Sequence, residues 1–198
     1  MTQTGLLQKS FFDRHHADVA REIVGCELIW DGVGGRVVET EAYAAEGDPA
    51  CHTFRRQTAR RFFQQHPPGT VYAFLNYGIH WLLNVLARDG IILFRSLEPT
   101  RGIGLMQQRR GRERSTELCS GPGRLGQALA LSGDDHGSTL LSADRHLLAR
   151  RAGLEDTQIA TDVRVGLSCG LEQPWRFLLP GNPHLSIPEG RAAATHRD

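Results

Sequence analysis

A glycine-rich turn between two strand-like segments indicates an antiparallel hairpin in the first quarter of this chain. Residues 26–30 and 36–43 are rich in strand-favouring residues, and the sequence Asp31-Gly32-Val33-Gly34-Gly35 lies between them. Such an arrangement is typical of a β-hairpin. Residues 45–49 follow the second strand, and their Gly, Asp and Pro content ends regular structure. The second strand therefore delivers its last side chains to the rim of a sheet.

The end of this second strand carries polar side chains that could perform chemistry. Because side chains alternate across a strand, Glu39, Glu41 and Tyr43 share one face. One carboxylate there could serve as a general base. A pair of glutamates on a strand is also typical of a solvated edge or of partners for arginine. We assign that structural role, with an arginine partner, to Glu39.

The composition is that of an ordinary soluble globular protein. The chain has 198 residues, 40% of them hydrophobic and 23% charged, which is enough to bury one sizeable core. We expect one domain over residues 1–198, with frayed ends at about 1–10 and 188–198. The formal net charge of +1 gives no argument from overall basicity, although 22 of the 23 basic residues are arginines and Lys9 is the only lysine.

Cysteine usage and hydropathy predict an intracellular protein that does not enter a membrane. The four cysteines are scattered without a Cys-x-x-Cys pair, so we expect reduced thiols rather than disulfides or zinc ligands. The sequence shows no secretory leader, and none of its apolar runs reaches the length of a membrane span.

A second hairpin is predicted further along the chain. Residues 70–75 and 80–87 have strand character, and Asn76-Tyr77-Gly78 between them predicts a tight turn. Tyr77 at its tip has no core to pack against, and an exposed aromatic residue can act as a wedge between stacked bases. Residues 91–95 form another expected strand, which ends at Arg95.

Helices are predicted on either side of these strands. Residues 13–24 carry a helical stripe of apolar side chains, with Asp13 as the expected N-cap and Gly25 as the stop. A helix followed by a loop is expected within residues 99–114, and another helix continues over residues 125–131. Residues 163–166 and 177–179 are expected late strands.

Two arginine-containing segments could contact phosphates. Residues 55–61 include four arginines, which favour either a solvated loop or a phosphate contact. Arg124 lies next to the expected start of a helix, where backbone N–H groups attract anions.

Several stretches of the chain match the pattern of one known family. They are Phe11-Phe12-Asp13, Gly35-Arg36-Val37-Val38-Glu39-Thr40-Glu41-Ala42-Tyr43, Arg56-Gln57-Thr58, Pro68-Gly69-Thr70-Val71-Tyr72, Tyr77-Gly78, Phe94-Arg95-Ser96-Leu97-Glu98-Pro99 and Leu118-Cys119-Ser120-Gly121-Pro122. In these stretches, which run in order from about residue 11 to residue 186, the chain resembles the alkyladenine (3-methyladenine) DNA glycosylase family.

The resemblance implies an α+β fold, in which a single domain has a curved antiparallel β-sheet, surrounding helices and a protruding β-hairpin that inserts into DNA. It also implies a monomer that needs no metal or other cofactor, and a double-stranded DNA partner containing damaged purines. The enzyme would flip an alkylated or deaminated purine, such as 3-methyladenine or 7-methylguanine, out of the duplex and hydrolyse its N-glycosidic bond, which starts base excision repair. Hypoxanthine and ethenoadenine stay open as substrates.

The resemblance also implies roles for individual residues. Glu41 would be the general base that activates water, and Arg95 would help to hold that water and a phosphate. Tyr77 would fill the gap left by the flipped nucleotide. The base pocket would be formed by Tyr43, His52, Phe74 and Asn84, with Asn84 as its selective wall. The DNA backbone would be contacted by Arg56, Arg60, Arg61 and Arg124.

The chain departs from the family pattern at two places. Phe74 replaces a second pocket tyrosine and so keeps the stacking face without the hydroxyl. Ala59-Arg60-Arg61 replaces Pro-Arg-Asn, which affects the expected backbone contact.

The chemistry of the lesions and the lysine content indicate the type of reaction. An N-alkylated purine is cationic and leaves easily, and aromatic faces such as those of Tyr43 and Phe74 hold a cation well. Neutral lesions need acid help. Because Lys9 is far in sequence from every candidate site residue, a water nucleophile without lyase activity is favoured over a Schiff base.

Two alternative functions stay open at this point. A metal-dependent hydrolase could use Glu39, Glu41, Asp48 and His52 as ligands, although their spacing matches no recognised metal motif. A non-catalytic DNA-damage binder would use the arginines and Tyr77 without any role for Glu41.

Overall fold

The two longest strands, β2 and β5, form the middle of an open antiparallel sheet. The structure is a computed structural model that describes residues 5–150 and 153–192. The sheet has the strand order β3-β4-β5-β2-β1-β6, while β8 pairs with β2 and β7 pairs with β8. The strands are β1 (Glu27–Trp30), β2 (Val33–Ala44), β3 (Val71–Asn76), β4 (His80–Leu86), β5 (Gly90–Arg101), β6 (Arg145–Leu148), β7 (Ala160–Asp162) and β8 (Arg176–Leu178).

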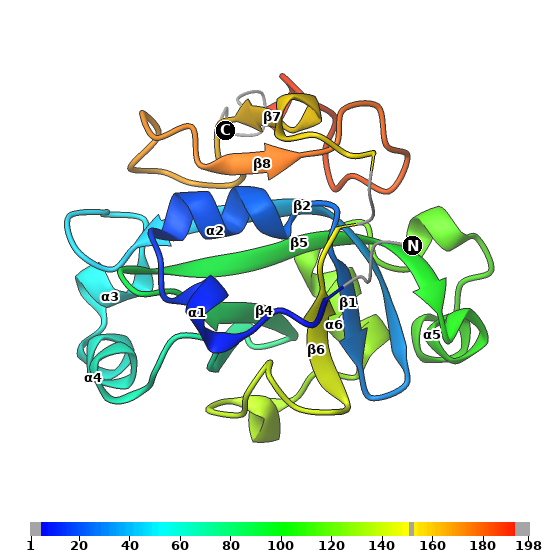
Figure 1. Ribbon diagram of the computed structural model, residues 1–198, viewed down its shortest axis with the longest axis horizontal. Helices are drawn as coiled ribbons and strands as arrows, with labels where there is room; N and C mark the ends of the chain where they lie inside the picture. The colour runs from blue at the N-terminus through cyan, green and yellow to red at the C-terminus, as the bar shows by residue number, and fades with distance from the viewer. Residues whose placement is uncertain (1–4, 151–152, 193–198) are drawn as a thin grey trace.

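Helices surround this sheet, with α2 lying along β2 and α6 packing against β4 (Figure 1). The helices are α1 (Lys9–Phe12), α2 (His16–Ile23), α3 (His52–Arg55), α4 (Gln57–Gln65), α5 (Ile103–Arg110) and α6 (Pro122–Leu129), with short 3₁₀ turns η1 (Ser115–Glu117), η2 (Gly133–Asp135) and η3 (Asp156–Gln158). The expected α+β class with one antiparallel sheet is therefore confirmed. Within the described ranges, no helix has the length and apolarity needed to cross a bilayer.

The glycines of the first hairpin have two different functions. Asp31 and Gly32 form the turn itself, with φ of 45° and 83°, as a two-residue hairpin loop requires. Gly34 and Gly35 already belong to β2. A Cβ at Gly34 would lie 2.1 Å from the carbonyl oxygen of Leu28, and one at Gly35 would lie 2.2 Å from that of Glu98. Glycine is needed there because the neighbouring strands approach too closely for a side chain.

Strand β2 changes its pairing partner along its length. It pairs with β1 from Val33 to Arg36, then with β8 from Glu39 to Glu41. Its register against β5 shifts around Val37, Glu39 and Thr40. Such irregularities bend a strand and increase its twist. We attribute the expected curvature of the sheet to these register shifts between β2 and β5.

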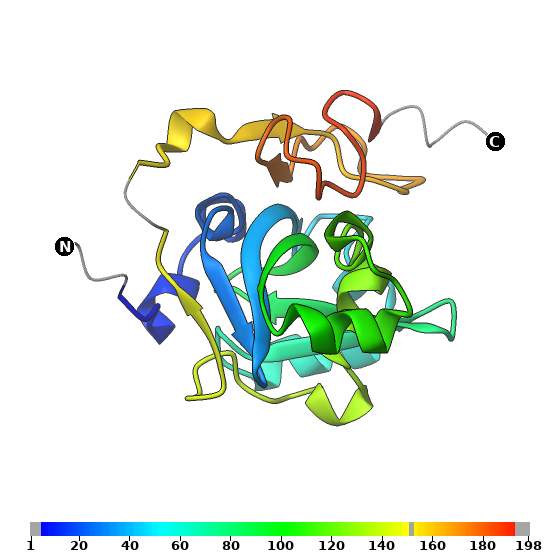
Figure 2. The ribbon, with the colours of Figure 1, turned by 90° about the vertical axis from the view of Figure 1, so that its right-hand side faces the viewer.

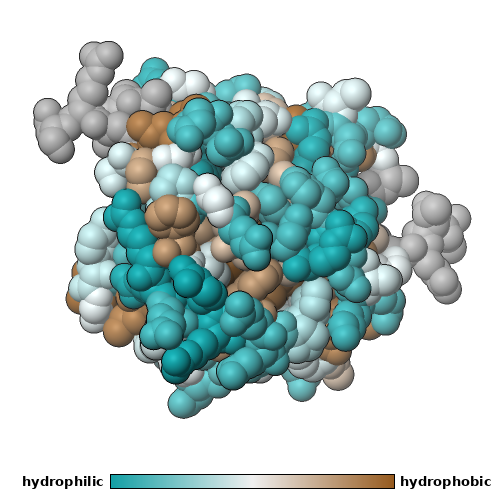
Figure 3. Space-filling model, turned by 90° about the vertical axis from the view of Figure 1, so that its left-hand side faces the viewer, coloured by the Kyte–Doolittle hydropathy of each residue, from teal (hydrophilic) through white to brown (hydrophobic). Residues whose placement is uncertain are grey.

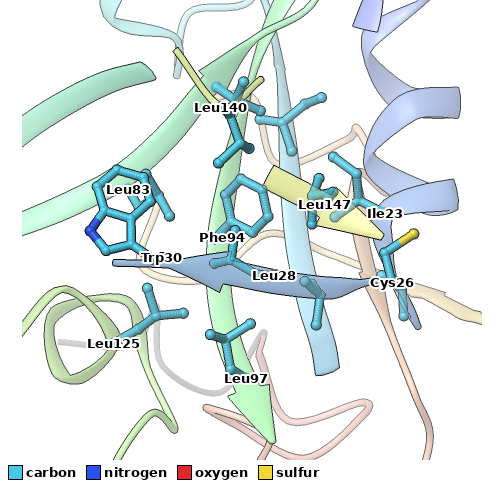
Figure 4. Packing of buried hydrophobic residues seen from close by; sticks show 14 of the residues in the cluster. Ile23, Cys26, Leu28, Trp30, Leu83, Phe94, Leu97, Leu125, Leu140 and Leu147 are labelled. Carbon is cyan, nitrogen blue, oxygen red and sulfur yellow. The ribbon is translucent and has the colours of Figure 1, made fainter. Parts of the chain in front are cut away.

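Two hydrophobic clusters stabilise the sheet. The larger joins α2, β1, β5 and α6, and Figure 4 shows Ile23, Leu28, Phe94, Leu97 and Leu125 within it. The smaller cluster contains Cys51, Ala59, Tyr72, Leu86 and Ile91, with partly buried aromatic side chains packed around it. This second cluster supports the cavity described below.

Several local expectations were wrong. Residues 13–24 do not form one helix, since Asp13 is the C-cap of α1 and His15 takes the N-cap position of α2. The start of α2 is capped instead from a distant turn, because the Asp89 carboxylate accepts a hydrogen bond from the His16 backbone N–H at 2.8 Å. Residues 163–166 form no strand.

The arginine-rich segment 55–61 is mostly helical rather than a loop, and β6 was not predicted at all. The expected frayed ends lie partly outside the described residues, at 1–4 and 193–198. Within the described part, α1 already begins at Lys9.

Candidate active site

A cavity of about 280 Å³ opens between the end of β2, the β3–β4 hairpin and the start of α6. Six residues singled out from the sequence line it, namely Tyr43, His52, Phe74, Tyr77, Asn84 and Arg95. The structure thus brings together side chains from β2, α3, β3, β4 and β5 and from the hairpin turn. Figure 3 shows the face that carries α3 and α4, where hydrophilic side chains prevail and hydrophobic patches lie between them.

Glu41 lies behind the wall of this cavity and is fully buried. Its Oε2 accepts a hydrogen bond from the Tyr43 hydroxyl at 2.7 Å and lies 3.3 Å from Nη1 of Arg95, while its Oε1 accepts from the backbone N–H of Val165 at 2.6 Å. Tyr43, Arg95 and Val165 all line the cavity. The carboxylate is therefore one layer from the cavity and is oriented by three donors.

Glu39 has the structural role expected of it. Its Oε1 accepts hydrogen bonds from Nε of Arg95 at 2.9 Å, from Nε of Arg176 at 2.8 Å and from the Ser186 hydroxyl at 2.7 Å. Its Oε2 accepts from the Ser186 backbone N–H at 2.7 Å and from the Ser96 hydroxyl at 3.1 Å. Burial alone would raise the pKa of Glu39, but Arg95 and Arg176 outweigh it, and the pKa is lowered.

Arg95 connects the two glutamates. It is 6% exposed and bridges Glu39 and Glu41 from β5, the strand next to β2. Burial opposes its charge, yet the two carboxylates raise its pKa above the ordinary value. Arg95 is therefore a permanent cation at the cavity wall, with its orientation set mainly by Glu39.

His52 is held as a neutral ring. Its Nδ1 lies 3.2 Å from the Tyr72 hydroxyl, and its ring centroid lies 4.0 Å from that of Phe74. Burial and the nearby charge of Arg56 lower the pKa of His52 to about 4. Burial also raises the pKa of Tyr72 to about 12, so Tyr72 keeps its proton. A neutral imidazole offers one donor and one acceptor nitrogen, and one of them is directed to Tyr72.

The hairpin tip carries Tyr77 in a conformation that is unusual for a large side chain. Tyr77 is 87% exposed, and its φ of 52° is followed by 71° at Gly78. The Ile79 N–H donates to the Asn76 carbonyl at 3.1 Å, which closes a type I′ turn. Figure 2 shows this hairpin projecting from the body at the right. Large side chains rarely adopt positive φ, and residues in such strained conformations cluster at functional sites.

Asn84 is fixed by backbone groups. Its Nδ2 donates to the carbonyls of Tyr72 at 3.0 Å and Leu82 at 3.2 Å. The residue is 7% exposed and lines the cavity. With its amide nitrogen held in this way, the amide group forms a rigid part of the cavity wall.

The predicted phosphate-contacting arginines differ in their availability. Arg60 donates to the carbonyls of Thr53 and Phe54, so its guanidinium caps the C-terminal end of α3. Arg61 and Arg56 are exposed, and the Arg56 guanidinium lies over the Phe74 ring. Arg124 is exposed as well and donates to the Ser120 hydroxyl at 3.0 Å.

The metal-hydrolase alternative finds little support in the arrangement of its proposed ligands. Asp48 is paired with Arg164 through both carboxylate oxygens, and Glu39 is surrounded by arginine and serine donors. Among the described residues, the one group spaced to hold a metal ion is His15, His16 and Asp89, which shares no member with the predicted set.

Sequence reasoning missed several residues of this site. Val165 contributes a backbone N–H, for which a sequence carries no signal. Arg176 and Ser186 come from the late part of the chain, where β-strands are short. Tyr72 could have been found, because it lies two residues before Phe74 on β3 and therefore shares its face.

Comparison of the sequence with known proteins finds matches over most of its length. A family model described as methylpurine-DNA glycosylase matches residues 10–183. Three similar relatives carry the name "Putative 3-methyladenine DNA glycosylase". The protein of Rhodopseudomonas palustris (strain HaA2) is 41% identical over 186 residues, covering 92% of this chain and 90% of its own. That of Agrobacterium fabrum is 42% identical (90% and 91% covered), and that of Nitrosospira multiformis is 40% identical (89% and 92% covered).

Proposed function

Because this chain belongs to the methylpurine-DNA glycosylase family, we propose that it excises alkylated or deaminated purines from duplex DNA by hydrolysis with a water activated by Glu41. 3-Methyladenine and 7-methylguanine are the proposed substrates, with hypoxanthine as a further candidate. The protein acts on intracellular DNA as a monomer. The observation that carries the proposal is a buried carboxylate, Glu41, held by three donors directly behind a cavity of about 280 Å³.

The chemistry follows from this arrangement. The water oxygen attacks the anomeric carbon while its proton passes to Glu41, and the electrons of the breaking N-glycosidic bond leave with the base. A small displacement of the Tyr43 hydroxyl gives the water access to Oε2 of Glu41. Arg95 holds the Glu41 carboxylate in its orientation, and it offers a charge to the adjacent phosphate.

The remaining residues prepare the substrate. A base inside a duplex cannot be reached, so it must be extruded at a cost of a few kcal/mol. Tyr77 occupies the space that the base leaves, Tyr43 and Phe74 stack on the extruded base, and Asn84 excludes the amino group of guanine. Arg56, Arg60, Arg61 and Arg124 are proposed to contact the phosphates, with Arg60 the least available in the free protein.

The decisive experiment is release of free base from alkylated duplex DNA under single-turnover conditions. Glu41→Gln is expected to bind lesion DNA normally and to release base roughly 10²–10⁴-fold more slowly, because the amide cannot take a proton. Glu46→Gln is the matched control, since Glu46 is an exposed glutamate just after the same strand. Release by Glu41→Gln at the wild-type rate would remove Glu41 from the mechanism.

The same assay separates an enzyme from a non-catalytic binder and a hydrolase from a lyase. A binder would retain lesion DNA without releasing base. A monofunctional enzyme leaves an abasic strand that breaks only on alkaline treatment. Borohydride should trap no covalent adduct, because the only lysine, Lys9, does not line the cavity. A trapped adduct would contradict the water mechanism.

A further inference from the structure

Both aromatic walls of the cavity carry an arginine on the face turned away from it. The guanidinium carbon of Arg164 lies 4.7 Å from the ring centroid of Tyr43, and that of Arg56 lies 5.0 Å from the ring centroid of Phe74. Tyr43 and Phe74 line the cavity, whereas neither arginine does. Each ring therefore separates a cation from the space proposed for the base.

The position of Arg164 is closely determined. It is 1% exposed and lies between the rings of Tyr43 and Trp175. Its guanidinium donates to both oxygens of Asp48 and to the carbonyls of Ala42 and Gly170. A Cβ at Gly170 would lie 2.9 Å from Nη2 of Arg164, so the guanidinium packs directly against a position that has no side chain.

Arg56 occupies the equivalent place behind Phe74 but is exposed to solvent. It takes the N-cap position of α4 and also lines a neighbouring surface groove. Its charge is felt inside the cavity, since Arg56 adds to burial in lowering the pKa of His52. The two arginines thus lie behind two different walls of the same space.

A cation on one face of an aromatic ring changes what the other face prefers. The ring attracts a cation through its negative π face, and a guanidinium already bound draws that density toward itself. A second cation on the opposite face then gains less and is also repelled by the first charge. An uncharged base loses nothing by this.

We propose that Arg56 and Arg164 are specificity-determining residues, which act through Phe74 and Tyr43 to favour uncharged purine lesions over cationic N-alkylated purines. This inference rests on the proposed function, and it names the substrate class that the pocket favours. Cationic lesions leave easily without help, so the stacking walls are instead adjusted to bases that carry no charge.

The test compares hypoxanthine with 7-methylguanine in otherwise identical duplexes, with saturating enzyme and single-turnover kinetics. Arg56→Met keeps the length of the side chain and removes its charge. The ratio of hypoxanthine release to 7-methylguanine release is expected to fall by about 2- to 5-fold, the range of a partly exposed cation–π contact. Any lost phosphate contact lowers both rates together and cancels in the ratio.

Arg61→Met is the matched control, because Arg61 is an exposed arginine of α4, close to Arg56 in the chain, that lies over no ring of the cavity. Its ratio should equal that of the wild type. A ratio unchanged in Arg56→Met, or changed equally in both variants, would overturn the inference. If wild-type protein releases neither base, the proposed function itself fails, and the two failures are thereby distinguished.

Arg164 is tested together with its partner, because a lone substitution would leave Asp48 buried and unpaired. The pair Asp48→Asn with Arg164→Gln removes both charges and keeps hydrogen-bonding groups in place. A folded double variant should lower the ratio in the same direction as Arg56→Met, and an unchanged ratio would refute the part assigned to Arg164. If the double variant does not fold, the Arg56 comparison decides the inference.

Discussion

Replacing Glu39 by glutamine separates the structural glutamate of β2 from the proposed catalytic one. In the native protein Glu39 accepts five hydrogen bonds, two of them from buried arginines. The glutamine side chain accepts hydrogen bonds only at its oxygen, so its NH₂ group is left facing other hydrogen-bond donors. Arg95 and Arg176 also lose their shared negative partner.

The expected loss of stability depends on which carboxylate partners Arg95 and Arg176 keep in the variant. Removing one partner of a buried ion pair costs about 3–5 kcal/mol. Arg95 retains Glu41 at 3.3 Å and Arg176 retains Asp162 at 2.9 Å, so the lower end, about 3 kcal/mol, is expected. For a protein of this length that corresponds to a fall in the melting temperature of about 6–12 °C. The loss of stability caused by the substitution should become smaller as the pH falls below 4.5, the ordinary pKa of glutamate. The pKa of Glu39 is lowered in the folded protein, so its carboxylate stabilises the fold fully above 4.5, and this stabilisation is lost as the pH falls toward the lowered value.

The assay is thermal unfolding of Glu39→Gln and Glu41→Gln side by side, with single-turnover base release measured on both at a temperature where they are folded. Glu39→Gln should show the larger fall in melting temperature and a partial loss of release through the misplaced Arg95. Glu41→Gln should show the larger loss of release. If Glu39→Gln melted within about 2 °C of the wild type, the five hydrogen bonds would not have the stabilising role assigned to them.

Three further outcomes are expected. Tyr77→Ala should weaken lesion binding with little change in melting temperature, since an exposed tip contributes little to the core; unchanged binding with a lower melting temperature would make it a packing residue. Asn84→Ser should raise release of undamaged guanine relative to 3-methyladenine by about 1–3 kcal/mol of discrimination, and an unaltered ratio in a folded variant would place the selective wall elsewhere. The unfolded state should bind a proton at His52 below pH 6.5 while the native state does so only near pH 4, so stability falls by about 2 kcal/mol between pH 7 and pH 5. Chemical denaturation of wild type and His52→Gln at pH 7 and pH 5 measures this effect. The variant should lose about 2 kcal/mol less unfolding free energy than the wild type between the two pH values, and equal losses would argue against a buried neutral His52.

The hairpins could be predicted from sequence because their signals are local. Asp31-Gly32 and Tyr77-Gly78 mark tight turns between strand-like segments, and the side-chain alternation on β2 and β3 places Glu41, Tyr43 and Phe74 correctly on their strands. These features depend on residues close to each other in the chain.

The features that were missed depend on long-range contacts. Helix α4 was hidden by its arginines, although Ala59 and Phe62 pack toward the smaller cluster. The cap of α2 comes from Asp89, more than 70 residues away. Val165, Arg164 and Arg176 reach the site from a segment with short strands and irregular loops, where periodicity carries little information.

The turn at Tyr77 has a consequence for how this protein responds to selection. Asn-Gly is the sequence that a type I′ turn favours, and a bulky residue at positive φ costs about 1–2 kcal/mol. The six cross-strand pairs from Val71↔Val85 to Asn76↔His80 hold the hairpin whatever residue occupies its tip. Tyr77→Asn should therefore raise heat resistance while it blunts the hairpin. A laboratory screen that rewards survival at high temperature alone should therefore favour this substitution, and with it the loss of the side chain proposed to fill the space of the extruded base.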